Sequence, residues 1–112
     1  MPRIKKPFNL PMMLTNLLTR NGKCVAHSLD FDIVCAGDTE DEASEKLRLA
    51  IKTYVEFGIS NGWNDYIILS APQHYWDKLT SDVPLKIGPP IIIEGIERKV
   101  LEAQVSEDRV AA

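Results

Sequence analysis

Cysteine and histidine are scarce in this chain, and it has no long apolar run and no block of positive charge. Two cysteines and two histidines in 112 residues lack the paired spacing of a zinc site. The longest apolar stretch, Pro89–Ile93 with its flanks, falls short of the ~20 residues that cross a bilayer. The net charge of -3 argues against general affinity for nucleic acid. Membrane spanning, zinc binding and nucleic-acid binding are therefore not expected.

Catalytic and targeting motifs are missing as well. No Gly-x-Ser-x-Gly segment and no glycine-rich phosphate loop occurs, so neither nucleophilic catalysis nor nucleotide binding is indicated. The basic N-terminus (Arg3, Lys5, Lys6) is followed by prolines and asparagines rather than by the apolar core of a secretory signal. We expect a cytoplasmic protein whose thiols stay reduced.

The length and composition predict one domain. A chain with 45% hydrophobic and 26% charged residues is ordinary for a globular protein and supports a single core. Because so small a core leaves little margin, surplus apolar surface is expected to form a homo-oligomer contact.

Three strands are predicted in the first third of the chain, over Phe8–Leu18, Lys23–Leu29 and Ile33–Ala36. Asn21-Gly22 is a strong hairpin dipeptide, because both residues tolerate positive φ. A short, uncapped helix competes in the first segment, but the strand is preferred. The three strands form a meander in which we expect Val25 opposite Val34 and Cys24 opposite Cys35.

A helix follows the meander. Thr39 and Glu42 match the capping box, in which a hydroxyl and a carboxylate each satisfy a free backbone amide. Apolar residues then recur at spacings of three and four, which predicts an amphipathic helix that ends at Gly58 or Gly62. The predicted apolar stripe is Ala43, Leu47, Ala50, Ile51, Tyr54 and Val55.

The rest of the chain is less regular. Trp63–Leu69 is rich in aromatic and β-branched residues and predicts a fourth strand. A second capping-box pattern, at Ser70, predicts a short helix through Leu79. Prolines and glycine then indicate a linker before the apolar triplet Ile91–Ile93, and Glu94–Val105 is expected to be helical. The predicted fold class is α+β, in the order β-β-β-α-β, with a small antiparallel sheet and one packed helix.

Two segments resemble the HicB antitoxin family. One is Val25–Val34, which reads Val-Ala-His-Ser-Leu-Asp-Phe-Asp-Ile-Val, and the other is Gly37–Ala43, which reads Gly-Asp-Thr-Glu-Asp-Glu-Ala. Both are similar to the strand and helix start of that family, although Ser28 stands where the family usually has cysteine. The resemblance implies a cut-down ribonuclease H-like domain over residues 1–80, with residues 81–112 as an extension that serves as an oligomer contact or is partly disordered.

The resemblance also implies a function. HicB-like proteins typically bind and neutralise a small messenger-RNA-cleaving HicA toxin, commonly self-associate, and often have a C-terminal DNA-binding domain. Residues 81–112 are too short and too rich in proline for that domain, so operator binding is not expected. The alternatives are a solitary HicB-like domain without a toxin and, less favoured, a metal-dependent nuclease.

The expected partner contacts lie on the acidic surface. Asp30, Phe31 and Asp32 occupy the tight connection between two strands, and Glu40 and Asp41 lie beside the helix cap. Complementary charge would steer a basic toxin toward these residues. The same acids could in principle hold Mg²⁺, but carboxylates in the first turn of a helix are explained by the helix dipole. We expect no enzyme, cofactor or metal.

One histidine and both cysteines are predicted to have structural rather than catalytic roles. His27 has no nucleophile partner and is expected to be a hydrogen-bonded histidine on a half-buried strand. Cys24 and Cys35 are expected to be free thiols, because cysteine packs as a small hydrophobic residue.

Overall fold

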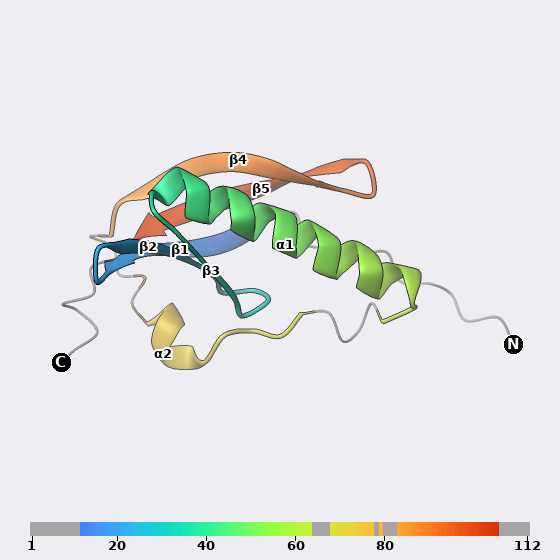
Figure 1. The fold of residues 1–112 in the computed structure, drawn as a ribbon. Coiled ribbons are helices and arrows are strands. Elements are labelled where there is room, and N and C mark those ends of the chain that lie inside the picture. Colours follow the sequence, from blue (N-terminus) through green and yellow to red (C-terminus); the bar gives the residue numbers. More distant parts are fainter. Residues whose placement is uncertain (1–11, 64–67, 78, 80–82, 106–112) are drawn as a thin grey trace, which may run out of the picture.

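The computed structural model describes residues 12–63, 68–77, 79 and 83–105. Within them the order of elements is β1 (Met12–Arg20), β2 (Lys23–Ser28), β3 (Ile33–Gly37), α1 (Glu40–Ser60), α2 (Gln73–Trp76), β4 (Leu85–Ile93) and β5 (Ile96–Gln104). The predicted α+β class is confirmed (Figure 1). No helix of the described residues has both the length and the apolar character that crossing a bilayer requires.

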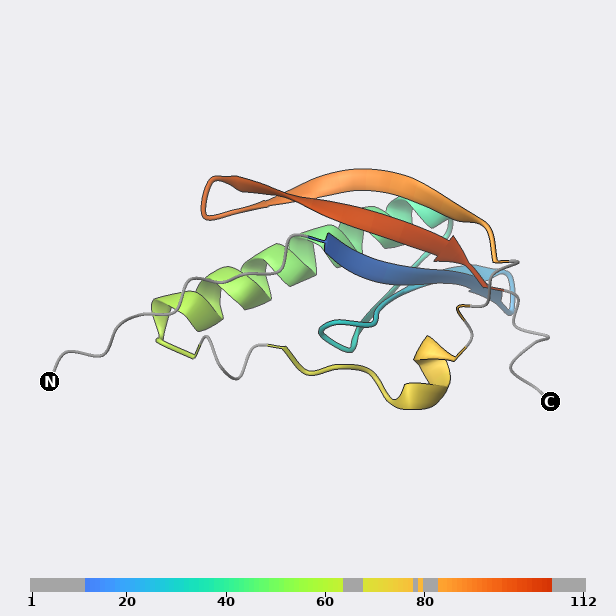
Figure 2. The ribbon, with the colours of Figure 1, turned by 180° about the vertical axis from the view of Figure 1, so that it is seen from behind.

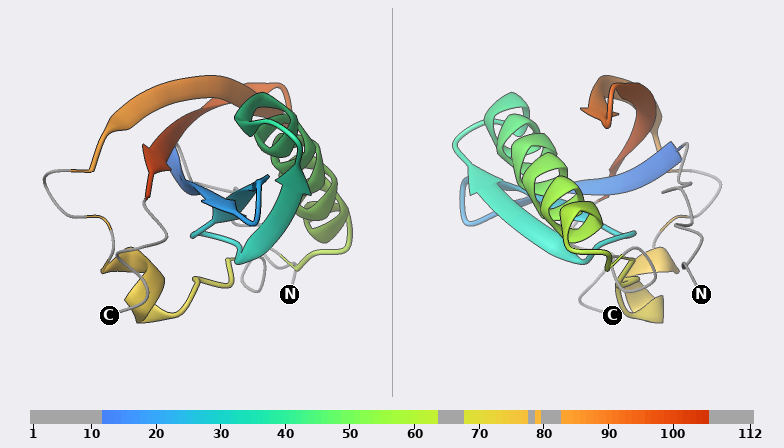
Figure 3. Two further views of the ribbon diagram at one scale, coloured as in Figure 1. Left: turned by 60° about the vertical axis from the view of Figure 1, so that its left-hand side comes forward. Right: turned by 90° about the vertical axis from the view of Figure 1, so that its right-hand side faces the viewer.

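The strands form one five-stranded sheet in the order β3-β2-β1-β5-β4. All neighbours are antiparallel except β1 and β5, which are parallel. The sheet is strongly curved, and α1 lies against one of its faces (Figure 3). The predicted meander is therefore present, and the strand beside β1 comes from the C-terminal part of the chain.

The first hairpin forms where the sequence predicts it. Asn21 and Gly22 adopt φ values of 52° and 76°, and β1 pairs with β2 from Arg20 opposite Lys23 onward. The competing helix over Met12–Leu18 is absent, because these residues belong to β1.

The predicted register of β2 and β3 is wrong by two residues. Val25 lies opposite Ala36 rather than Val34, and Cys35 lies opposite Ala26 rather than Cys24. The turn is centred one residue later than expected. Since a shift of two preserves side-chain alternation, Cys24 and Cys35 still share one face, which packs against the core, whereas Val34 is exposed.

Helix α1 begins as predicted. The Thr39 hydroxyl accepts a hydrogen bond from the Glu42 amide at 3.1 Å, which caps the first turn. The Glu42 carboxylate accepts from the Asp38 amide at 3.4 Å rather than from Thr39, so the second half of the capping box is displaced by one residue. The helix runs to Ser60, and Gly62 follows with a φ of 73°.

The core lies between α1 and the sheet. Its buried side chains come from α1, from β1 and β2, from the turn before β3, and from β4 and β5. They are Met13, Leu17, Ala26, Phe31, Ala43, Leu47, Ile51, Val55, Ile59, Ile91, Ile93 and Val100.

The helix predicted over Glu94–Val105 is wrong, and the proline-rich segment before it is not an irregular linker. These residues form β4 and β5, which are joined by a tight turn at Glu94 and Gly95 with φ values of 53° and 75°. Pro89 and Pro90 lie at a register shift in β4, an edge strand, where proline removes no required hydrogen bond. Ile91 and Ile93 point into the core, and Ile92 points outward.

The segment between α1 and β4 differs in detail from the prediction. The strand expected over Trp63–Leu69 falls partly on residues 64–67, which lie outside the described residues, and its described residues belong to no strand. The expected short helix is present as α2 but lacks a side-chain cap. Instead, the Ser70 hydroxyl accepts a hydrogen bond from the Trp76 indole at 3.0 Å.

Candidate functional site

The connection between β2 and β3 contains three of the five predicted contact residues. The Asp30 carboxylate accepts a hydrogen bond from the Leu14 amide at 2.8 Å, which ties the turn to β1. Phe31 is 2% exposed and packs in the core. Asp32 is exposed and has a φ of 53°. Of the three side chains, Asp32 is therefore the one that a partner reaches most readily.

His27 connects this turn to the face of the sheet opposite α1. Its Nε2 lies 2.7 Å from Asp32 Oδ1, and its ring meets the edge of the Tyr75 ring with centroids 4.6 Å apart. The residue is 4% exposed. The hydrogen bond predicted for His27 is therefore present.

Burial raises the pKa of the Asp30 carboxyl above its ordinary value of 3.8, although the Leu14 amide opposes the shift. The folded state therefore holds the Asp30 proton more tightly than the unfolded state. The contribution of Asp30 to stability falls as pH rises from the unfolded pKa through the higher folded one, and is constant above it.

Asp30→Asn removes this ionisation and keeps an acceptor for the Leu14 amide. We expect the variant to gain stability relative to the wild type as pH rises from about 3 to 7. Asp30→Ala leaves the amide unsatisfied and should lower the free energy of unfolding by about 1–2 kcal/mol. Urea unfolding across this pH range checks both predictions. If the free energy of unfolding of the wild type rose relative to that of Asp30→Asn with increasing pH, the first prediction would be contradicted.

The acids at the start of α1 differ in whether a cation pairs with them. Lys86 lies 3.6 Å from Glu40, which also accepts a hydrogen bond from Gln104. Lys46 lies 3.0 Å from Glu42. Asp41 and Glu45 are exposed, and neither forms an ion pair with another described residue. Among the described residues, no cation neutralises Asp41 or Glu45.

The two predicted acidic groups do not form one patch. Asp30, Phe31 and Asp32 precede β3, whereas Glu40 and Asp41 follow it. At about 3.3 Å per residue, the five residues of β3 separate the groups by roughly 16 Å.

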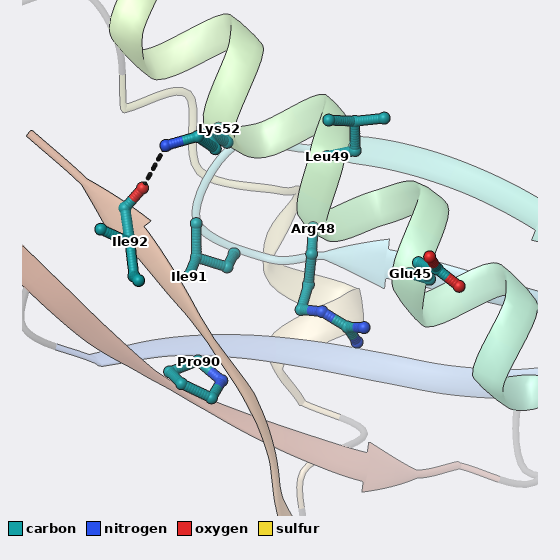
Figure 4. Close-up of a pocket in the computed structure, with 7 residues that line it drawn as sticks. All are labelled: Glu45, Arg48, Leu49, Lys52, Pro90, Ile91 and Ile92. Carbon is teal, nitrogen blue, oxygen red and sulfur yellow. Dashed lines mark hydrogen bonds between the residues drawn. The ribbon is translucent and has the colours of Figure 1, made fainter. Parts of the chain in front are cut away.

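An open groove of about 500 Å³ runs between α1 and β4. Its apolar lining comes from Leu49 on the helix and from Pro90, Ile91 and Ile92 on the strand, and its charged lining from Glu45, Arg48 and Lys52 (Figure 4). The Lys52 ammonium donates to the Ile92 carbonyl at 2.6 Å and so bridges the two sides.

This groove could not be predicted from the sequence, because the strand that forms one of its sides, β4, lies in residues 81–112, which were expected to be an extension. One signal was available: Leu49 is an apolar residue on the polar side of α1, and it is 66% exposed.

A buried polar contact fixes the first half of α1 to β5. Glu102 is 3% exposed, and its carboxylate accepts a hydrogen bond from the Ser44 hydroxyl, which also accepts from Arg48 at 2.8 Å. Lys86 lies 3.9 Å from Glu102. Hydrogen bonds and a nearby cation stabilise the buried carboxylate, so these residues hold the structure together.

The described residues form no cluster of metal-ligating side chains. Within the part of the chain that the structure describes, no three His, Cys, Asp or Glu side chains lie close enough to hold a metal ion. Cys24 and Cys35 are free and half-buried, and burial raises the pKa of the Cys35 thiol, which disfavours its reactive thiolate.

The described surface has exposed carboxylates on α1 beside exposed apolar side chains of the groove. Comparisons of the chain with protein families, with curated proteins and with solved structures find no match. The site is therefore interpreted from its own geometry: an acidic helix face, formed by Asp41 and Glu45, continues into an apolar groove.

Proposed function

We propose that this protein is a non-catalytic binding module of the HicB antitoxin type, which occludes a small basic RNA-cleaving protein. In this proposal it is cytoplasmic and homo-oligomeric, binds no operator DNA and needs no cofactor. The order of elements up to α1 supports it, since a meander followed by an amphipathic helix is the arrangement that the resemblance implies. The next strand is β4 rather than the one expected over Trp63–Leu69.

The observation that carries the proposal is a stripe along α1. Asp41, Glu45 and Leu49 follow one another at intervals of four residues and therefore share one side of the helix, and all three are exposed. Glu45 and Leu49 also line the groove. We name Asp41, Glu45, Leu49 and the groove residue Pro90 the α1 contact face.

This face suits a basic protein better than a small polar substrate. Its unpaired carboxylates attract cations at a distance, and the exposed apolar side chains beside them supply area that gains from burial. Asp32 lies at the far end of β3 and is a peripheral contact at most. The toxin's active site would be blocked by the bulk of the bound domain, without any reaction.

The test is a calorimetric titration of the full chain with the small basic protein encoded next to its gene. We expect a saturable complex whose affinity falls with added salt, because exposed charges contribute to it. The double variant Asp41→Lys with Glu45→Lys should weaken binding about tenfold or more.

Asp77→Lys is the matched control for the single variant Asp41→Lys, because each reverses the charge of one exposed aspartate and Asp77 lies on the segment around α2, away from the α1 contact face. It should bind like the wild type. Equal losses of affinity in both variants would mean that net charge alone causes the effect, and they would refute the α1 contact face. An adjacent basic protein that does not bind would favour the solitary HicB-like domain.

A further inference from the structure

On the face of the sheet turned away from α1, large apolar side chains of β4 are exposed. Figure 2 shows this side, where neither α1 nor α2 lies in front of these strands. The register places Ile87 beside Leu101, and Leu101 beside Leu14, in one row across three strands. A second row places Met12 beside Lys99.

Large apolar side chains on this face are exposed to solvent. Ile87 is 79% exposed, Leu85 59%, Ile92 54% and Met12 47%. A folded monomer rarely exposes so many neighbouring apolar groups unless they form a contact. We name Met12, Leu85, Ile87, Ile92 and Leu101, together with Glu97 and Lys99, the open-face patch.

The charges of the open-face patch identify its occupant. Glu97 and Lys99 are exposed, and they lie two residues apart on the same side of β5, about 7 Å from each other. Neither forms an ion pair with another described residue. One acid and one base make the patch neutral, so it does not favour a strongly basic partner.

A second copy of the chain satisfies both charges. If β5 of one copy stacks antiparallel on β5 of the other, a twofold axis near Arg98 places Glu97 of each copy against Lys99 of its partner. The apolar side chains of both hairpins then lie between the sheets, as in sheet-on-sheet packing. Self-complementary charge of this kind sets the register of a symmetric interface.

Pairing through the edge of β4 is disfavoured. Pro89 and Pro90 have no amide hydrogen to donate, and the Ile92 carbonyl already accepts from Lys52. The face of the hairpin, not its edge, is thus the surface available to a second copy.

We propose that two copies associate face to face through the open-face patch, with each α1 on the outside of the dimer. This dimer specifies the interface of the homo-oligomer that the proposed function includes, and the inference rests on that proposed function. It leaves both α1 contact faces free, so one dimer can bind two partners.

The test is sedimentation equilibrium of the full chain without any toxin. Because no toxin is present, the absence of a dimer is distinguished from a failure to bind toxin. The wild type should sediment with twice the mass of one chain. Ile87→Lys should raise the dimer dissociation constant about tenfold or more. Phe57→Lys, which changes an exposed apolar residue of α1 outside the α1 contact face, should leave it unchanged.

Charge reversal tests the antiparallel register. Glu97→Lys and Lys99→Glu should each weaken the dimer, and the double variant should restore it, because the exchanged charges again face each other. A monomeric wild type, a dimer insensitive to Ile87→Lys, or a double variant without rescue would each overturn the proposal. A monomer that Ile87→Lys destabilises would show that the chain itself occupies the patch.

Discussion

Ile93→Ala is expected to lower the free energy of unfolding by about 3–4 kcal/mol. Ile93 is 0% exposed and belongs to the core beneath α1, so truncation removes buried methyl groups and leaves a cavity. Urea denaturation followed by circular dichroism measures the change.

Ile92→Ala is the control from the same strand. Ile92 is 54% exposed, and its main-chain bond to Lys52 does not depend on the side chain. In dilute protein the change should be within about 0.5 kcal/mol. Equal effects at both positions would mean that β4 does not pack as described.

Gly37→Val is expected to cost about 3 kcal/mol. Gly37 ends β3, and a Cβ atom placed there would lie 2.7 Å from the Ala43 amide nitrogen and 3.0 Å from Glu42 Cβ. Since the closest of these atoms is backbone in the first turn of α1, the strand or the helix must shift. Thermal and urea unfolding would both report the loss.

Ala36→Val provides the comparison for Gly37→Val. Ala36 is exposed on the same strand, so the added methyl groups meet solvent and the change should be within about 0.5 kcal/mol. A neutral or stabilising Gly37→Val would show that the junction between β3 and α1 is looser than the structure has it.

The N-terminal half of the fold could be predicted because its signals are local. Asn21-Gly22 specifies a tight hairpin, and the Thr39 cap with the repeat of apolar residues behind it specifies α1. The register of β2 and β3 could not be predicted as well. It depends on a turn in which Asp32 adopts a positive φ, and no residue there requires that conformation.

The C-terminal strands were missed because their local signals conflict. Pro89 and Pro90 resemble a linker, and the spacing of Ile96, Val100 and Ala103 fits a helix. Pairing with β1, almost 90 residues away in sequence, decides the outcome, and the buried Glu102 is tolerated only because Ser44 and Lys86 lie beside it.

Only part of the candidate site could be predicted, because contacts between residues distant in the sequence decide which of its acids are neutralised. The sequence identifies acids near the helix start but does not tell which of them are neutralised. Lys86 is distant in the chain and lies beside Glu40, whereas Asp41 remains free. Phe31 was expected at a contact because it lies in a turn, but the turn folds inward and buries its side chain.

The most direct test of the central claim is the rate at which the neighbouring basic protein cleaves labelled RNA as this chain is added. If the α1 contact face occludes that protein, cleavage should stop near equimolar addition of the wild type. The variant with lysine substitutions at Asp41 and Glu45 should need about tenfold more protein, or more, to reach the same inhibition. Undiminished cleavage with the wild type, or cleavage by this chain alone that Asp30→Asn abolishes, would contradict the account.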